Sequence, residues 1–243
     1  MRALFKKEIN TFFSHANGTI IIVTFLVTNS LLLWLISNEY NILDSGYAQL
    51  NGLFSLSPLL FMVFIPALCM RLFSEEINNG TIEILKTLPI SDNTLVFSKY
   101  LSALAISWIA ILPTVIYYIS IYFLSEELGN VDSAGILGSY IGLFLLSALF
   151  VAIGVFASSS TKNQITSFLV AILIISMFYF GFDLIANEIQ NGFIQLCISY
   201  IGIDYHYTAL SKGVIDFRDV VYFVSLSLVF IQLTIYNINR KRK

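Results

Sequence analysis

Few side chains in this sequence are of the types and spacings that catalyse reactions or bind metal ions. The two histidines, His15 and His206, are far apart, and neither belongs to a Cys/His cluster. Zinc sites need three or four such ligands together. The sequence also contains no Gly-x-x-x-x-Gly-Lys-Ser/Thr phosphate loop, no Gly-x-Ser-x-Gly turn and no His-Glu-x-x-His motif. We therefore expect no catalytic residue, no metal site and no ATP hydrolysis by this chain alone.

The polar residues with the most distinctive pattern lie in one charged connection, at residues 75–91. A Thr-Ile-Glu triplet at residue 81 opens an amphipathic turn, and a proline at residue 89 cannot continue a helix. A short, partly apolar helix at residues 75–89 is suited to contact with the membrane surface or with another protein. Its candidate contact residues are Glu75, Glu76, Gly80, Thr81, Glu83, Leu85 and Pro89.

The elements that position this connection are long apolar blocks. Of the 243 residues, 57% are hydrophobic and 12% charged, about half the charged share of soluble domains. The blocks have the length of about 17–25 residues that a helix needs to cross a bilayer, and they lack the alternation of barrel strands. We predict an all-α integral membrane protein, one transmembrane domain over residues 1–243. Its six spans are residues 18–37, 53–73, 100–124, 136–157, 165–185 and 220–238.

The distribution of Lys and Arg predicts the orientation of these spans. Eleven of the thirteen Lys and Arg residues fall on one side, and only Lys212 and Arg218 on the other. The basic side faces the cytoplasm under the positive-inside rule. We therefore expect a multi-pass protein of a bacterial inner (cytoplasmic) membrane with both termini in the cytoplasm. The eleven residues are Arg2, Lys6, Lys7, Arg71, Lys86, Lys99, Lys162, Arg240, Lys241, Arg242 and Lys243.

The N-terminal residues 1–16 have the pattern of an amphipathic helix that lies along the membrane surface. Their basic residues suit anionic headgroups. Glu8 is the exception, because it intrudes on the apolar half of the helix. A simple charged flank of the first span remains the alternative. The apolar residues that share one half of the helix are Leu4, Phe5, Ile9, Phe12 and Phe13.

Two further features leave alternatives open. The 34-residue external connection at residues 186–219 contains enough apolar residues to return partly into the membrane, but it could also be a plain loop. Gly138 and Gly142 form a small-xxx-small pair in the fourth span, a spacing that lets helices approach closely. That close approach could be helix packing within the chain or a subunit interface.

Several motifs resemble a known family. The pattern Glu76-x-x-x-Gly80-Thr81-Ile82-Glu83-x-Leu85-x-x-x-Pro89-Ile90-Ser91, followed by Lys99-Tyr100-Leu101, is similar to the signature region of type-2 ATP-binding-cassette (ABC-2) permeases. Other segments, in the same order along the chain, resemble the gliding-motility permease subunits of that family, the GldF type. These segments are residues 41–44, 138–143, 152–159, 178–183, 205–207 and 213–216.

The resemblance implies more than the residues do alone. It implies that residues 75–89 form a coupling helix that fits a groove on a separate ABC ATPase, and that short re-entrant helices precede the last span. ATP and Mg²⁺ would then be bound by that ATPase, and this chain would need no cofactor. A second permease subunit, identical or related, and the lipid bilayer are the other expected partners; we expect no nucleic acid. The function implied is export or the driving of a gliding-motility or secretion machine. The alternative is a membrane scaffold of such a machine that transports nothing.

Overall fold

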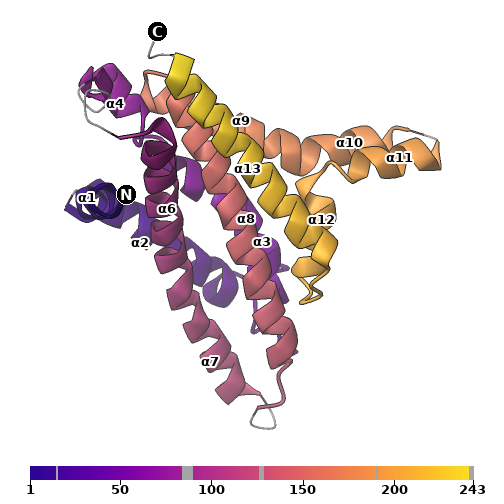
Figure 1. Ribbon diagram of the computed structural model, residues 1–243. Helices are drawn as coiled ribbons and strands as arrows, with labels where there is room; N and C mark the ends of the chain where they lie inside the picture. The colour runs from indigo at the N-terminus through magenta and orange to yellow at the C-terminus, as the bar shows by residue number, and fades with distance from the viewer. Residues whose placement is uncertain (15, 84–89, 126–128, 190, 241–243) are drawn as a thin grey trace.

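The computed structural model describes residues 1–14, 16–83, 90–125, 129–189 and 191–240. All regular elements in these residues are helical (Figure 1). Six helical segments among them are long and apolar enough to cross a membrane, so the predicted all-α membrane fold is confirmed. Each predicted span overlaps one of these segments. They are Gly18–Leu35, Asn51–Asn78, Asp92–Leu124, Ser133–Ser160, Gln164–Asn187 and Phe217–Arg240.

Several segments consist of more than one helical element. In the third segment the cause is the proline at residue 113, which removes a backbone donor. A 3₁₀ turn separates α6 from α7 there. The elements are α1 (Arg2–Ser14), α2 (Ala16–Ser30), the π-helical turn η1 (Leu31–Leu35), α3 (Asn51–Cys69), α4 (Ser74–Asn78), α6 (Asp92–Ile111), η2 (Leu112–Thr114), α7 (Val115–Leu124), α8 (Ser133–Ser160), α9 (Gln164–Ser176), the π-helical turn η3 (Met177–Gly181), α10 (Phe182–Asn187), α11 (Gly192–Ser199), α12 (Ile203–Leu210) and α13 (Phe217–Arg240).

Helix α8 is the centre of the bundle. It packs against α3, α6, α9, α12 and α13, and 72% of its most apolar stretch is buried. The corresponding buried share is only 22% for the first spanning segment and 17% for the fifth. The sides of these two segments are therefore left for lipid or for another subunit.

The N-terminal helix α1 packs against α6 and α2 rather than extending freely from the first span. At the far side of the bundle, α10 and α11 lie side by side and project away from the other helices (Figure 1). Helix α12 then returns to contact α8 and α13. Residues 192–210 are thus largely helical rather than a plain loop. Phe193 and Leu196 on α11 remain 77% and 55% exposed, as suits contact with lipid.

Candidate functional site

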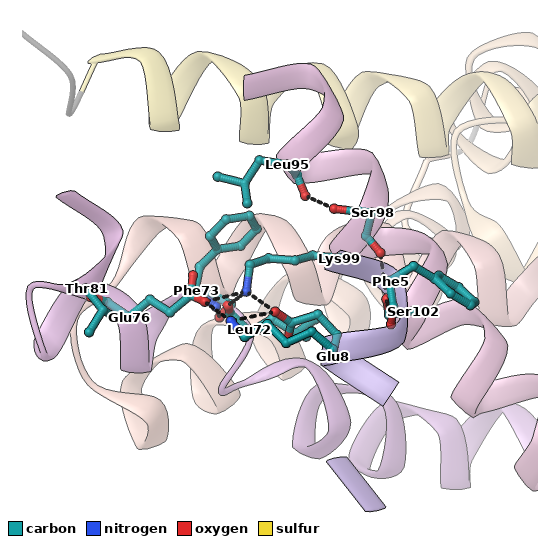
Figure 2. A network of polar contacts seen from close by, with 12 residues as sticks. Phe5, Glu8, Leu72, Phe73, Glu76, Thr81, Leu95, Ser98, Lys99 and Ser102 are labelled. Atoms are coloured by element: carbon teal, nitrogen blue, oxygen red, sulfur yellow. Dashed lines mark hydrogen bonds and ion pairs between the residues drawn. The ribbon is translucent and has the colours of Figure 1, made fainter. Parts of the chain in front are cut away.

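A buried lysine, Lys99 on α6, lies where the N-terminal helix, the connection after α3 and the third span meet (Figure 2). Its side chain is only 2% exposed. The ammonium nitrogen lies 3.0 Å from Glu8 Oε1 and 2.9 Å from Glu76 Oε1, and it donates to the carbonyl oxygen of Leu72 at 2.7 Å. An ammonium group has three N–H donors. All three therefore have an oxygen acceptor from another segment.

The two glutamates are paired with a second lysine as well. Lys7 Nζ lies 3.5 Å from Glu8 Oε1 and 3.6 Å from Glu76 Oε1, while its side chain is half exposed. The four residues Lys7, Glu8, Glu76 and Lys99, called here the Lys99 network, therefore carry no net charge. Such balance lets charged groups stay out of water, since an unpaired buried charge costs several kcal/mol. The network ties α1 and α4 to α6.

Serine side chains hold the turn between α3 and α4 against the central helix. Ser158 on α8 accepts hydrogen bonds from the backbone amides of Phe73 and Ser74, at 3.0 and 3.1 Å, and donates to the carbonyl oxygen of Met70 at 3.1 Å. These groups have no helical partner because α3 ends at Cys69. The connection after α3 is thus fixed to the central helix as well as to α1 and α6.

The prediction of one helix over residues 75–89 is wrong in one respect, because the helix is interrupted after residue 78. Helix α4 ends at Asn78, and Gly80 follows with a φ of +70°. This left-handed conformation ends helices and favours glycine. Helical turns resume at residues 81–83, where Thr81 Oγ1 donates to the carbonyl oxygen of Glu76 at 3.3 Å. The sequence reading missed the break because it treated Gly80 as part of the family motif and not as a helix stop.

The predicted contact residues occupy different positions in this segment. Glu76 belongs to the Lys99 network, whereas Glu75, Thr81 and Glu83 are more exposed. Ile82 is only 6% exposed and packs in the core, so it anchors the second turn. Leu85 and Pro89 lie outside the described residues. Glu75, Thr81 and Glu83 are therefore the described members of the set that a partner could reach.

Sequence reasoning did not identify Lys99 and Glu8 as members of a site. It counted Lys99 as a basic residue for topology and as part of a motif, and it treated Glu8 as an intrusion on an apolar face. Both residues carried a usable signal, since a charge on a face that must be buried needs an opposite charge. The 91 residues that separate them hid the pairing.

The predicted pair of small residues in the fourth span contacts another part of the same chain. A Cβ added at Gly138 would lie 2.5 Å from the carbonyl oxygen of Gly213, and one added at Gly142 would lie 2.7 Å from the Cβ of Leu210. Both neighbours belong to the end of α12 and the turn after it. The two glycines thus let α12 lie close to α8.

A second buried polar contact connects α12 with the start of α13. His206 Nδ1 lies 2.7 Å from Asp219 Oδ1, and His206 Nε2 lies 3.0 Å from the carbonyl oxygen of Tyr200. The imidazole stacks on the Tyr222 ring, with centroids 3.9 Å apart. Among the described residues there is no group of three or more His, Cys, Asp or Glu side chains that could hold a metal ion. The arrangement is that of a structural link between helices.

Comparison with known proteins gives the family. The model of the ABC-2 family transporter proteins matches residues 5–237, from the N-terminal helix to the last spanning helix. No curated protein matches the chain. The match covers nearly the whole sequence, from within α1, through the connection after α3, to within the last of the six spanning segments. The chain therefore belongs to the ABC-2 family of transporter proteins, the membrane-spanning and non-catalytic components of such transporters.

Proposed function

We propose that this permease component receives the motion of a separate ABC ATPase through the connection after α3 and passes it to α1 and α6 through the Lys99 network. The observation that carries the proposal is the bridging position of Glu76. Its carboxylate lies 2.9 Å from Lys99 Nζ on α6, and Lys7 on α1 lies within 3.6 Å. A push on α4 therefore acts on two other helices without passing through soft loops.

The exposed end of this segment is the part we assign to the ATPase. Gly80, Thr81 and Glu83 are accessible there, while Ile82 and Glu76 hold the segment to the bundle. Leu85 and Pro89 complete the proposed contact by family resemblance. ATP and Mg²⁺ would be bound by the ATPase, and a second permease subunit, identical or related, would complete the path across the membrane.

The test begins with affinity purification of the tagged chain from gently solubilised membranes. We expect an ABC ATPase to be recovered and to be lost or reduced with Glu83→Ala, because the exposed carboxylate contacts the partner directly. Glu188→Ala, an exposed glutamate after α10, is the matched control. Equal ATPase recovery by both variants, with full ATP-driven activity, contradicts the assignment.

The system that this subunit serves is a further part of the proposal. Resemblance to gliding-motility permease subunits favours an inner-membrane complex that drives motility or secretion, with both termini in the cytoplasm. Reporter fusions at residues 1 and 243 and in the connection at residues 125–132 test the orientation. Deletion of the gene in its host, followed by measurement of cell movement, tests the motility role.

A second candidate function is a membrane scaffold that drives a motility or secretion machine without transporting anything. It is favoured by the scarcity of charged side chains at depth: α2, α3, α8 and α9 contain none. A carrier of polar solutes needs polar groups along its path. Reconstitution of the complex in vesicles distinguishes a transporter from a scaffold. ATP-dependent accumulation of any cargo in the vesicles contradicts the scaffold function.

A further inference from the structure

Beside the Lys99 network, the structure contains an open groove of about 690 Å³. Its walls come from α1, the start of α2, the end of α3, α4 and α6, which is the basic end of the bundle. The volume is within the range of small-molecule sites, roughly 300–1,000 Å³. It is enough for a lipid headgroup with its glycerol and the first carbons of its chains.

The lining of the groove divides into a polar and an apolar part. The polar part carries the charged residues Arg71 and Glu75 in addition to the members of the Lys99 network. Ile20, Ile21 and Leu68 belong to the apolar part. Ile20 is 58% exposed on the outer side of α2, so the groove reaches the surface that faces lipid. A ligand that matches this lining is an amphiphile.

Two charges at the groove have no partner of opposite sign among the described residues. Arg71 donates through Nε to Gln164 Oε1 at 3.1 Å, a neutral acceptor, and forms no ion pair within the described part of the chain. Neither does Glu75, whose side chain is exposed. In contrast, Lys7, Glu8, Glu76 and Lys99 compensate one another. The groove therefore offers one cation and one anion to a ligand.

We infer that this groove binds a membrane phospholipid with a zwitterionic, amine-bearing headgroup, such as a phosphoethanolamine lipid. The guanidinium of Arg71 binds the phosphate, for which its planar donors are suited. The carboxylate of Glu75 attracts the ammonium of the headgroup, and the acyl chains lie along Ile20, Ile21 and Leu68. Bound there, the lipid packs between α1 and α4 next to the Lys99 network.

This inference does not depend on the proposed contact with an ATPase. Lipid binding is therefore measured without nucleotide, on the full chain purified in detergent together with any subunits that accompany it. Three additives with identical acyl chains are titrated: phosphatidylethanolamine, phosphatidylglycerol and diacylglycerol. Binding is followed by native mass spectrometry and by the thermal unfolding midpoint. We expect phosphatidylethanolamine to bind most tightly and diacylglycerol, which lacks the phosphate, to bind least.

Two variants outside the Lys99 network test the assigned contacts. Arg71→Gln should weaken binding of both phospholipids about tenfold or more, the effect of losing a charge-assisted hydrogen bond. Glu75→Gln should reduce the preference for the amine headgroup, which we expect to be a few-fold because exposed charges are screened. Arg218→Gln and Glu188→Gln, at the opposite end of the bundle, are the matched controls.

Three outcomes overturn the inference. The first is equal binding of diacylglycerol and phosphatidylethanolamine, which indicates unspecific surrounding lipid. The second is unchanged phospholipid binding by Arg71→Gln. The third is a preference for phosphatidylglycerol, which places a purely anionic ligand in the groove. Equal recovery of the ATPase by Glu83→Ala and Glu188→Ala contradicts the proposed coupling role but does not change the lipid preference. The failure of that proposal and the failure of this inference are therefore distinguishable.

Discussion

Replacement of Lys99 by methionine removes one charge from the Lys99 network and keeps most of the volume of the unbranched side chain, which becomes one heavy atom shorter. Glu8 and Glu76 then lie with only Lys7, 3.5 and 3.6 Å away, as a counter-charge. Their side chains are 11% and 14% exposed, so water compensates them poorly. The carbonyl oxygen of Leu72 also loses its donor.

The magnitude of this effect follows from the burial of the three charges. Removal of one partner from a buried ion pair costs about 3–5 kcal/mol. For a protein of this size, 1 kcal/mol shifts the unfolding midpoint by about 2–4 °C. We therefore expect Lys99→Met to lower the midpoint by roughly 6–20 °C. Lys212→Met, an exposed lysine on the other side, should leave the midpoint nearly unchanged.

The assay is thermal unfolding of the purified chain in detergent, combined with a rescue. The triple variant Lys99→Met, Glu8→Gln, Glu76→Gln has no buried charge left in the network, so it should recover most of the lost stability. Lys7 keeps its charge because its side chain is half exposed. The reasoning is refuted if Lys99→Met shifts the midpoint no more than Lys212→Met, or if the two glutamine changes lower the stability further.

Three other substitutions test the remaining parts of the site. Gly80→Ala should cost about 1–2 kcal/mol, because its φ of +70° disfavours a Cβ although nothing lies within 4 Å; ATP turnover should also uncouple from function, and an unchanged midpoint contradicts the assigned helix stop. Asp219→Asn removes the charge that faces His206 and should cost about 1.5–3 kcal/mol in the same unfolding assay; wild-type stability means that the contact is unimportant. Gly138→Val pushes α8 away from the turn after α12 and should cost about 1–3 kcal/mol, whereas Gly192→Val, with open space around it, is the control and should be neutral.

The sequence alone determined the fold class and the spans. Apolar blocks long enough to cross a bilayer predict helices, because a backbone in lipid must satisfy its own hydrogen bonds. The proline at residue 113 removes a backbone donor, and a 3₁₀ turn interrupts the third span there. These features are local properties of consecutive residues, so they need no knowledge of the remainder of the chain.

The helix stop at Gly80 depended both on the local sequence and on the tertiary structure. Glycine at the end of a helix is a local signal, but the family pattern favoured one continuous helix over residues 75–89. The structure ends α4 at Asn78 instead. Glycine permits both the helical and the left-handed conformation, and its surroundings decide between them. Here the left-handed turn at Gly80 is followed by Ile82, whose side chain is buried against the bundle. Burial of Ile82 is therefore the part of the surroundings that accompanies the stop.

Only the tertiary structure decided which charges belong together. Lys99 and Glu8 are 91 residues apart, and nothing in the sequence around either residue names the other as its partner. The same holds for Gly138 and the turn after α12, and for the groove that brings Arg71 and Glu75 next to the apolar residues of α2. Hydropathy is summed along the chain, whereas a salt bridge or a groove depends on how separate helices pack in space. The sequence therefore determined that these helices cross the membrane, and their packing decided what the helices hold between them.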